Sequence, residues 1–211
     1  MADDEARFRS EVRAWLDGNA PARGSADDFS AAHIVSAASR EEFEALERSA
    51  MDTTRRWQRR LFEAGWAARA WPEEYGGQGR PAWQADVVAE EQGGYGVSTK
   101  MLAIALEMVP PVLLRHGTHE QRLTHLPRIA RGDEAWCQLL SEPDAGSDLA
   151  NVQTFASPAV DGGWTVTGQK VWTSGATSAD FALLLARTDR RAPGREGVSC
   201  FPIGGHRVGK G

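Results

Sequence analysis

Apolar residues in the first part of the chain recur at the three- to four-residue spacing of α-helices. Asp3 and Asp4 can cap a first helix, which Gly18-Asn-Ala-Pro21 would end. The apolar face of this helix carries four residues, Phe8, Val12, Trp15 and Leu16. Residues 20–38 show no periodic pattern and predict a loop.

A longer helix is predicted from Ser39 to Ala64, with Ser39 as its cap and Glu42 three residues later. Its apolar stripe has four members, Phe43, Leu46, Trp57 and Leu61. Four arginines lie on the other side of the helix, Arg55, Arg56, Arg59 and Arg60. This arrangement is typical of an amphipathic helix with a solvated basic face, so we do not interpret it as a nucleic-acid surface.

Three more helical stretches follow a turn-rich connection over residues 65–80. The first runs from Pro81 to Gln92. The second begins at Ser98, is apolar on nearly all sides from Met101 to Val109, and is ended or bent by Pro110 and Pro111. We therefore expect it inside a bundle. The third starts with a capping box of Thr118 and Gln121 and ends at Gly132-Asp133.

After Gly132 the pattern changes to short β-prone runs separated by glycine-containing turns. Six strands are expected, at residues 136–140, 153–158, 164–167, 170–172, 181–187 and 197–202. Asp161-Gly-Gly163 and Gly168-Gln169 have the composition of hairpin turns, and a glycine-rich tail follows the last strand. The sequence thus predicts an α+β chain with a helical domain at residues 1–133 and a β-domain at residues 134–211.

Composition narrows the functional class without defining it. A formal net charge of −5 gives no general attraction to nucleic acid or anionic lipid, and no apolar run approaches the length of a membrane span. The Met-Ala-Asp-Asp-Glu start lacks the features of a signal peptide, so we expect a cytoplasmic protein. Cys137 and Cys200 lie in apolar surroundings and are expected to be reduced, buried thiols. Three histidines lack companions at ligand spacing, so no metal site is predicted: His116, His119 and His125.

Candidate chemistry gathers in two stretches, residues 138–148 and 170–174. In the first, Gly146 permits positive φ, so that consecutive N–H groups can form a nest for a phosphate. Ser141 and Ser147 add hydroxyl groups, and Trp172 in the second stretch offers a flat ring. Such a set suits a nucleotide cofactor with an aromatic head. From the residues alone, an irregular loop and a core tryptophan remain alternatives.

These stretches carry a family resemblance. Glu-Pro-x-Ala-Gly-Ser-Asp at residues 142–148, followed by Gly-Gln-Lys-x-Trp-Thr-Ser at residues 168–174, resembles the paired flavin signature of the acyl-CoA dehydrogenase family. Residues 71–77 and 116–121 also resemble that family's helical domain. The resemblance implies a helical amino-terminal domain, an antiparallel β-barrel-like domain, and a carboxy-terminal helical bundle that this chain does not contain.

The resemblance also implies which residues bind the cofactor, FAD. Eight positions match: Gln138, Leu140, Ser141, Gly146, Ser147, Trp172, Thr173 and Ser174. By resemblance, the residues around Ser141 meet the polar edge of the flavin ring, and Trp172 packs on one ring face. Gly146 and Ser147 approach the pyrophosphate, Ser147 also lies near the acyl-CoA substrate, and Ser174 lies near the reactive flavin nitrogen. Gln138 stands where an aromatic is frequent in the family, which leaves the substrate subclass open.

The implied function is the FAD-dependent α,β-dehydrogenation of an acyl-CoA thioester, with electron-transferring flavoprotein or a similar acceptor and with assembly into a homo- or hetero-oligomer. No residue matches the family's catalytic glutamate, which lies in the missing helical domain, so no catalytic residue is predicted. Glu142 is expected to be a structural carboxylate with a low pKa. A non-catalytic truncated chain, a subunit completing a partner's flavin site, and a related flavin oxidase or monooxygenase remain alternatives.

Overall fold

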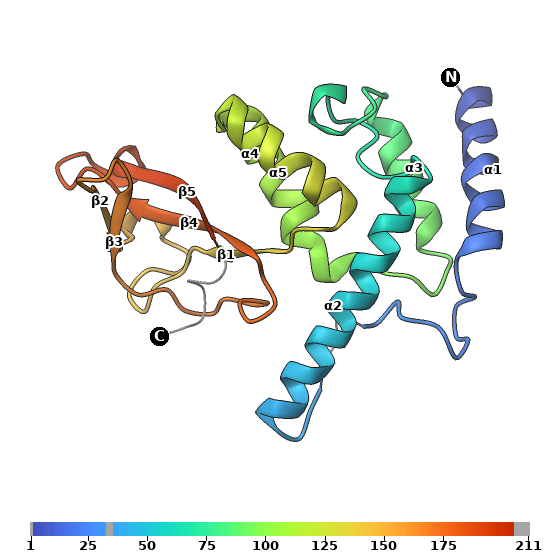
Figure 1. Cartoon of the computed structure of the whole chain (residues 1–211), viewed down its shortest axis with the longest axis horizontal. Coiled ribbons are helices and arrows are strands. Elements are labelled where there is room, and N and C mark those ends of the chain that lie inside the picture. Colours follow the sequence, from blue (N-terminus) through green and yellow to red (C-terminus); the bar gives the residue numbers. More distant parts are fainter. Residues whose placement is uncertain (1, 33–35, 205–211) are drawn as a thin grey trace. The chain divides into compact units, whose positions relative to one another are not determined.

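The structure is a computed structural model that describes residues 2–32 and 36–204 (Figure 1). The chain divides into two compact units, Met1–Glu134 and Ala135–Gly211, and we describe each by itself. The first is helical, and the second contains a mixed sheet. Whether they are separate domains divided after residue 133 stays a prediction, because compactness alone does not show that each part folds independently. The glycine-rich tail lies outside the described residues.

The helical unit contains five α-helices in its described part, α1 (Ala2–Asn19), α2 (Arg40–Glu63), α3 (Ala82–Gln92), α4 (Val109–His116) and α5 (His119–Arg131). Three shorter helical turns accompany them, η1 (Glu73–Tyr75), η2 (Lys100–Leu102) and the π-helical η3 (Ile104–Met108). The first strand of the chain begins at Trp136. The expected order, helices first and strands afterwards, is therefore confirmed.

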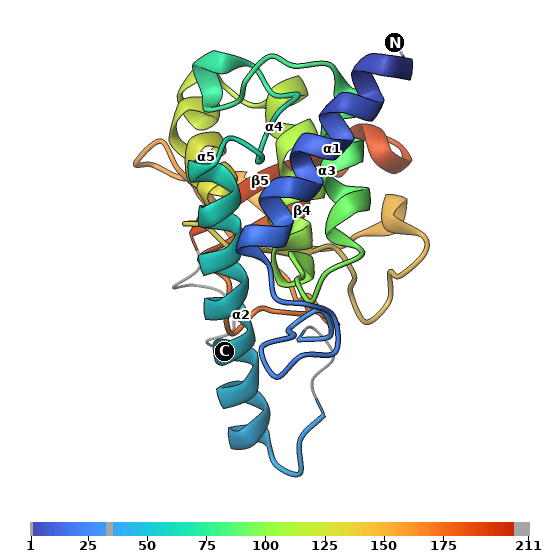
Figure 2. The same ribbon diagram turned by 90° about the vertical axis from the view of Figure 1, so that its right-hand side faces the viewer.

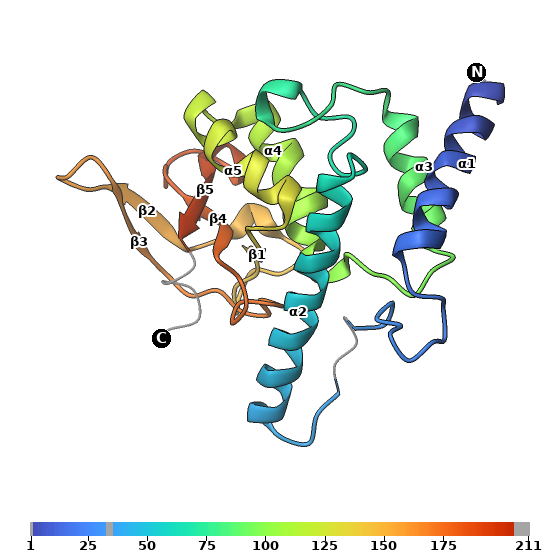
Figure 3. The ribbon, with the colours of Figure 1, turned by 45° about the vertical axis from the view of Figure 1, so that its right-hand side comes forward.

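Helix α1 packs along α3, as Figures 2 and 3 both show. Phe8, Val12 and Leu16 are buried in a cluster that includes Val87 and Val88 of α3. The expected capping by Asp3 and Asp4 is wrong, because both lie inside the first turn of α1. Their negative charges there interact favourably with the positive end of the helix dipole.

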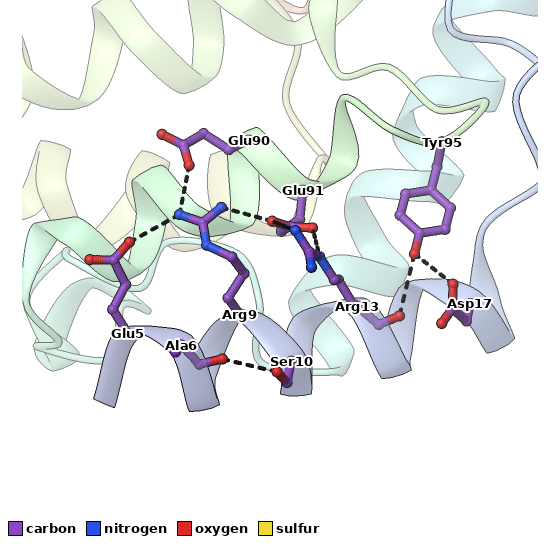
Figure 4. A network of polar contacts seen from close by, with 9 residues as sticks. All are labelled: Glu5, Ala6, Arg9, Ser10, Arg13, Asp17, Glu90, Glu91 and Tyr95. Carbon is purple, nitrogen blue, oxygen red and sulfur yellow. Dashed lines mark hydrogen bonds and ion pairs between the residues drawn. The ribbon is translucent and has the colours of Figure 1, made fainter. Parts of the chain in front are cut away.

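Polar contacts join the same two helices at their surface (Figure 4). Arg9 donates to Glu91 at 2.7 Å and to Glu90 at 2.9 Å, and Arg13 donates to Glu91 at 2.5 Å. Beyond the end of α3, the Tyr95 hydroxyl donates to Asp17 of α1 at 2.6 Å. This bond and the burial of the hydroxyl raise the pKa of Tyr95 to about 12. These contacts set the register of α1 on α3.

Helix α2 begins as predicted, with the Ser39 side chain accepting a hydrogen bond from the Glu42 amide at 3.1 Å. Trp57 and Leu61 are buried, as expected for its apolar stripe. Phe43 and Leu46, assigned to the same stripe, are 41% and 43% exposed, so that part of the prediction is wrong. The buried positions of α2 start only at Glu47, and its first turns therefore run outside the core.

The basic side of α2 is not simply solvated. Arg55 donates to the Asp133 carbonyl at 3.0 Å, and Arg59 donates to the Asp133 carboxylate at 2.5 Å. Arg60 donates to the Asn19 side chain at 3.0 Å. The arginines therefore secure the ends of other helices to α2, which spacing along α2 could not reveal.

The stretch after Ser98 is helical without a break from Lys100 to His116, and its geometry changes from the turn η2 through the π-helical η3 to α4. Pro110 and Pro111 occupy the first positions of α4, where the missing amide hydrogens cost nothing, and the π-helical η3 precedes them. Three of the apolar residues are buried within the unit itself, Leu102, Ala105 and Val109, as expected. Met108 is 38% exposed.

Helix α5 has the predicted capping box in both directions, from Gln121 N to Thr118 Oγ1 and from Thr118 N to Gln121 Oε1. It ends at Gly132, whose φ of 81° places it in the left-handed region favoured by glycine. His125 is buried and lies 2.9 Å from the Glu134 carboxylate.

The described β unit contains β1 (Trp136–Leu139), β2 (Phe155–Pro158), β3 (Trp164–Thr167), β4 (Phe181–Arg187) and β5 (Val198–Gly204), with the short turns η4 (Leu149–Asn151) and η5 (Gly194–Gly197). β4 is central: β1 and the end of β2 pair with it in parallel, and β5 pairs with its whole length in antiparallel orientation. β3 continues from β2 as an antiparallel hairpin (Figure 3). Asp161-Gly-Gly163 forms the turn of this hairpin, as predicted.

The antiparallel, barrel-like arrangement is confirmed only in part. The pairs β4–β5 and β2–β3 are antiparallel, but β1 and the end of β2 pair with β4 in parallel, because the long irregular segments 140–154 and 168–180 let the chain cross over and return. One predicted strand is wrong. Residues 170–172 form no strand, so Gly168-Gln169 is not a hairpin turn. Trp172 has a φ of 60°, which is incompatible with an extended strand.

The core of the β unit combines leucines such as Leu184 with several small side chains. Cys137, Ala156, Ala182 and Ala186 are fully buried around β1, β2 and β4. Burial raises the pKa of the Cys137 thiol to about 11, which keeps it protonated and inert. Cys200 is free but exposed, contrary to the expectation that both thiols are buried.

Candidate functional site

The two candidate stretches meet in the β unit. The Lys170 ammonium donates to the Leu140 carbonyl at 2.9 Å, and the Val171 amide donates to the Ser141 carbonyl at 3.0 Å. The end of β1 is thereby joined to the irregular segment that carries Trp172. Segments 30 residues apart in sequence therefore form one local structure.

Glu142 is the buried centre of this structure. Its backbone closes a tight turn with Ala145, through N–H to carbonyl bonds of 2.8 and 3.2 Å in the two directions. Its carboxylate accepts the Gln153 amide at 2.6 Å, the Thr154 amide at 2.9 Å and the Lys170 ammonium at 2.8 Å. Every oxygen of this carboxylate is therefore held by a donor.

These donors decide the protonation of Glu142. Burial by itself would raise the pKa of the carboxylate, but the Lys170 ammonium and the amide donors outweigh that effect and hold the pKa of Glu142 at about 2. The side chain is consequently an ionised structural group and a poor proton acceptor at neutral pH. The expectation for Glu142 is confirmed.

Lys170 is the site residue that sequence reasoning missed. Only 6% of its side chain is exposed, and it contacts the turn at Glu142 and the end of β1 together. A lysine followed directly by Val171 and Trp172 was the available signal, because a cation in apolar surroundings needs an acidic partner.

Gly168 is required by a close approach and not by a hairpin. A Cβ atom there would lie 2.4 Å from Thr154 Oγ1 and 2.6 Å from Thr154 Cα, and the φ of Gly168 is 153°. The absence of a side chain brings the segment before Lys170 against the residue that donates to Glu142. The glycine of the second signature thus permits the Lys170–Glu142 contact.

Trp172 is not a core residue. Its side chain is 92% exposed, and its φ of 60° is a left-handed conformation that side chains other than glycine rarely adopt. A large aromatic ring without cover is costly in water, and local strain of this kind collects at functional sites. The alternative of an ordinary strand tryptophan is therefore excluded.

The positive φ expected at Gly146 is wrong, and the phosphate nest stays a prediction. Gly146 is not among the residues with positive φ, and a Cβ atom on it would meet nothing within 4 Å. The amides of Gly146 and Ser147 have no acceptor in the part of the chain that the structure describes. Both residues are exposed. The stretch therefore presents free N–H donors beside open space.

The segment after Ser147 is held firmly by an arginine. Arg187 of β4 donates to the Ala150 carbonyl at 2.6 Å and to the Val152 carbonyl at 3.2 Å. Its third contact is the Gly194 carbonyl at 3.2 Å. This side chain fixes the η4 turn onto the sheet.

The remaining predicted positions differ in how far their side chains are exposed. Leu140, Ser141 and Thr173 are half-buried, and Ser174 is exposed. Gln138 Oε1 is buried, and no hydrogen-bond partner for it lies within residues 2–32 and 36–204. The structure thus joins residues 140–142 of the first candidate stretch to Lys170 and Val171 of the second. No printed bond within the described chain joins Gly146 or Ser147 to residues 172–174.

Other site classes find no support in the described residues. None of their histidine, cysteine and acidic side chains cluster in a way that could hold a metal ion. None of the helices that the structure describes has both the length and the apolar character needed to cross a membrane.

Comparison with known proteins identifies the family of this chain. Residues 2–133 match the acyl-CoA dehydrogenase N-terminal domain, and residues 137–209 match the acyl-CoA dehydrogenase middle domain. The chain belongs to the acyl-CoA dehydrogenase family. It is similar to the acyl-CoA dehydrogenase IpdE1 of Mycobacterium tuberculosis, with 37% identity over 197 residues. That match covers 93% of this chain and 48% of the relative.

Solved structures give the same result. A variant of the Tcur3481-Tcur3483 steroid ACAD is 30% identical with a TM-score of 0.74, over 97% of this chain and 49% of that one. The ChsE4-ChsE5 complex from Mycobacterium tuberculosis contains a chain that is 31% identical with a TM-score of 0.68, over 95% of this chain and 47% of that one. The chain thus spans about half the length of the proteins it matches.

Proposed function

We propose that the β unit is the FAD-binding part of an acyl-CoA dehydrogenase. The observation that carries the proposal is the exposed side chain of Trp172. Its backbone has a left-handed conformation, and it follows closely on Lys170 of the buried Lys170–Glu142 pair. The charge pair makes the platform rigid, and the exposed ring lacks a partner that a flavin would supply.

The other residues fit the same group. The free amides of Gly146 and Ser147 suit the pyrophosphate, and the open space at Gly146 lets a ligand approach the backbone. Gln138, Leu140 and Ser141 would meet the polar edge of the flavin ring. The buried Gln138 oxygen would accept a hydrogen bond there. Thr173 and Ser174 would offer hydroxyls on the other side. Bound FAD would supply the hydride acceptor for dehydrogenation.

We further propose that the complete reaction is α,β-dehydrogenation of an acyl-CoA thioester, carried out by a larger assembly than this chain. Ser147 would lie near the thioester arm, while the flavin platform excludes water from one face. Glu142 cannot serve as the base, because its pKa of about 2 leaves it a weak proton acceptor. Electron-transferring flavoprotein as acceptor and a cytoplasmic location stay predictions.

FAD titration of the 211-residue chain tests the binding proposal. Trp172→Ala should weaken FAD binding by about tenfold, the value of a lost aromatic contact of roughly 1.4 kcal/mol. Gly146→Val should weaken binding without changing the unfolding midpoint, because the valine would fill the open space that the ligand needs. FAD affinity unchanged in both variants would show that the site lies elsewhere.

A second reading, a subunit that completes a partner's flavin site, is favoured by the ChsE4-ChsE5 complex and by the half-length coverage. Anaerobic mixing of the FAD-loaded chain with a panel of acyl-CoAs separates the readings. We expect no rapid bleaching of the flavin by the chain alone. Rapid bleaching that is lost in Glu142→Gln would contradict both the need for a larger assembly and the structural role of Glu142.

A further inference from the structure

The helical unit contains a pocket that the flavin proposal does not use. Its volume is about 520 Å³, within the range typical of small-molecule sites. Residues of α1, of α3 and of the connection between α2 and α3 line it. The pocket combines rings and charged groups, so its chemistry can be argued from its parts.

Aromatic rings form one part of the lining. Phe8 lies at the centre, with Trp66 at 5.8 Å and Trp83 at 5.3 Å between ring centroids, both edge-on. The three rings come from α1, the connection and α3, so they lock the walls of the pocket together. The Arg69 guanidinium lies over two of these rings, 4.9 Å from the Phe8 centroid and 5.4 Å from the Trp66 centroid. The half-buried Trp83 is the ring that offers apolar surface to a flat ligand group.

Arg69 and Arg80 form the second part. The Arg80 amide donates to the Arg69 carbonyl at 2.7 Å, which brings the two residues side by side. The Arg69 guanidinium is held by neutral acceptors, including Gln84 Oε1 at 2.6 Å and the Gly65 carbonyl at 2.7 Å. Burial and the positive charge of Arg80 lower the pKa of Arg69.

No acid forms a salt bridge with either arginine in the part of the chain described here. The lining carries three arginines against two carboxylates, those of Asp4 and Glu11. Two neighbouring cations without a paired acid are stabilised by a bound anion. The modest excess of positive charge in the lining favours a ligand with one negative charge over a ligand with two.

The indole N–H of Trp66 forms the third part of the pocket lining. Trp66 Nε1 is buried and has no hydrogen-bond partner among the described residues. An unpaired buried donor is costly, and an oxygen of a ligand in this pocket would satisfy it.

We propose that this pocket binds a small organic anion in which a flat apolar group carries one carboxylate. The carboxylate lies against Arg80 and Arg69, and the flat group lies along Trp83. The contacts between α1 and α3 in Figure 4 hold the lining in place before the ligand arrives. The site is independent of FAD binding.

Benzoate is the probe, measured by equilibrium dialysis against the 211-residue chain. We expect saturable binding that weakens as salt is added. Phenyl phosphate tests the second negative charge, inorganic phosphate tests the need for a ring, and benzyl alcohol tests the need for a charge. All three should bind more weakly than benzoate.

Variants locate the binding. Arg80→Gln should weaken benzoate binding by about tenfold, since it removes a charge-assisted contact from an exposed residue. Trp66→Phe keeps a ring but removes the N–H, and should weaken binding by about threefold. Arg56→Gln is the matched control, because that arginine is exposed on α2 and donates to Thr53 outside the pocket. Circular dichroism melting of each variant verifies the fold.

Saturable benzoate binding that is lost in Arg80→Gln and kept in Arg56→Gln supports the proposal. It is overturned by the absence of saturable binding, by equal binding in the Arg80→Gln variant, or by inorganic phosphate binding as tightly as benzoate. If Trp66→Phe melts early, Arg80→Gln alone decides the outcome.

Discussion

Trp57 of the helical unit and Trp172 of the β unit have opposite roles, although the β unit also buries a tryptophan, Trp136, which is 4% exposed. In the helical unit, Trp57 is 3% exposed, packs 5.7 Å from Trp15 and donates its N–H to Gln92 at 2.8 Å. In the β unit, Trp172 is 92% exposed and Trp164 is 48% exposed. The first kind of tryptophan builds a core. The second kind is available to a ligand or a partner.

The interiors of the two units differ as well. The helical unit buries a large apolar cluster that links α1, α2 and α3. The β unit has smaller apolar clusters and adds a buried ion pair between Glu142 and Lys170. Apolar packing is tolerant of pH, whereas a buried ion pair depends on the charge of both partners. The proposed site is therefore held by the more sensitive kind of interaction.

The largest expected contrast compares the two tryptophans directly. Trp57→Ala should lower the free energy of unfolding by about 4 kcal/mol, because it leaves a cavity in the helical core. Trp172→Ala should change it by less than about 0.5 kcal/mol, because the side chain makes little contact. Urea unfolding of both variants measures the difference. Similar losses would show that Trp172 is covered in solution.

Glu142→Gln tests the ion pair. It leaves the Lys170 ammonium buried without an opposite charge, which should cost about 3 kcal/mol. Hydrogen exchange of the Thr154 amide is the local readout, since that amide donates to Glu142. Glu196→Gln, on the exposed η5 turn, is the matched control and should leave exchange unchanged. Unaltered protection in Glu142→Gln would mean that the pair contributes nothing.

The pH dependence of the β unit follows from the same residue. The pKa of Glu142 is lowered from 4.5 to about 2 by folding, so its stabilising contribution is complete above pH 4.5 and is lost as the pH falls toward 2. Thr154 exchange, corrected for its intrinsic pH dependence, should report less protection over that window. The difference between the original chain and Glu142→Gln should shrink in parallel. A constant difference down to pH 2 would contradict the assignment.

The smallest expected effect lies in the helical unit. Thr118→Ala removes the side-chain half of the α5 capping box and should cost about 1 kcal/mol. FAD affinity should not change, because the residues of the flavin proposal all lie in the β unit. Urea unfolding and FAD titration of this variant test both statements together. Weaker FAD binding would reveal coupling between the units.

Local patterns were sufficient for much of this protein. Helix periodicity and side-chain caps depend on residues three or four positions apart, so the caps at Ser39 and Thr118 and the change to strands after Gly132 could be predicted. The sequence around Glu142 likewise predicted a structural carboxylate.

Tertiary structure decided what depends on distant neighbours. The exposure of Phe43, the pairing of Arg59 with Asp133 and the parallel pairing of β1 with β4 follow from where other segments pack. The backbone conformations at Gly146 and Trp172 also depend on distant neighbours, because the Lys170–Glu142 contact and the close approach at Gly168 constrain the irregular loops. Sequence period reports which side of an element is apolar, but only three-dimensional packing determines whether that side is covered.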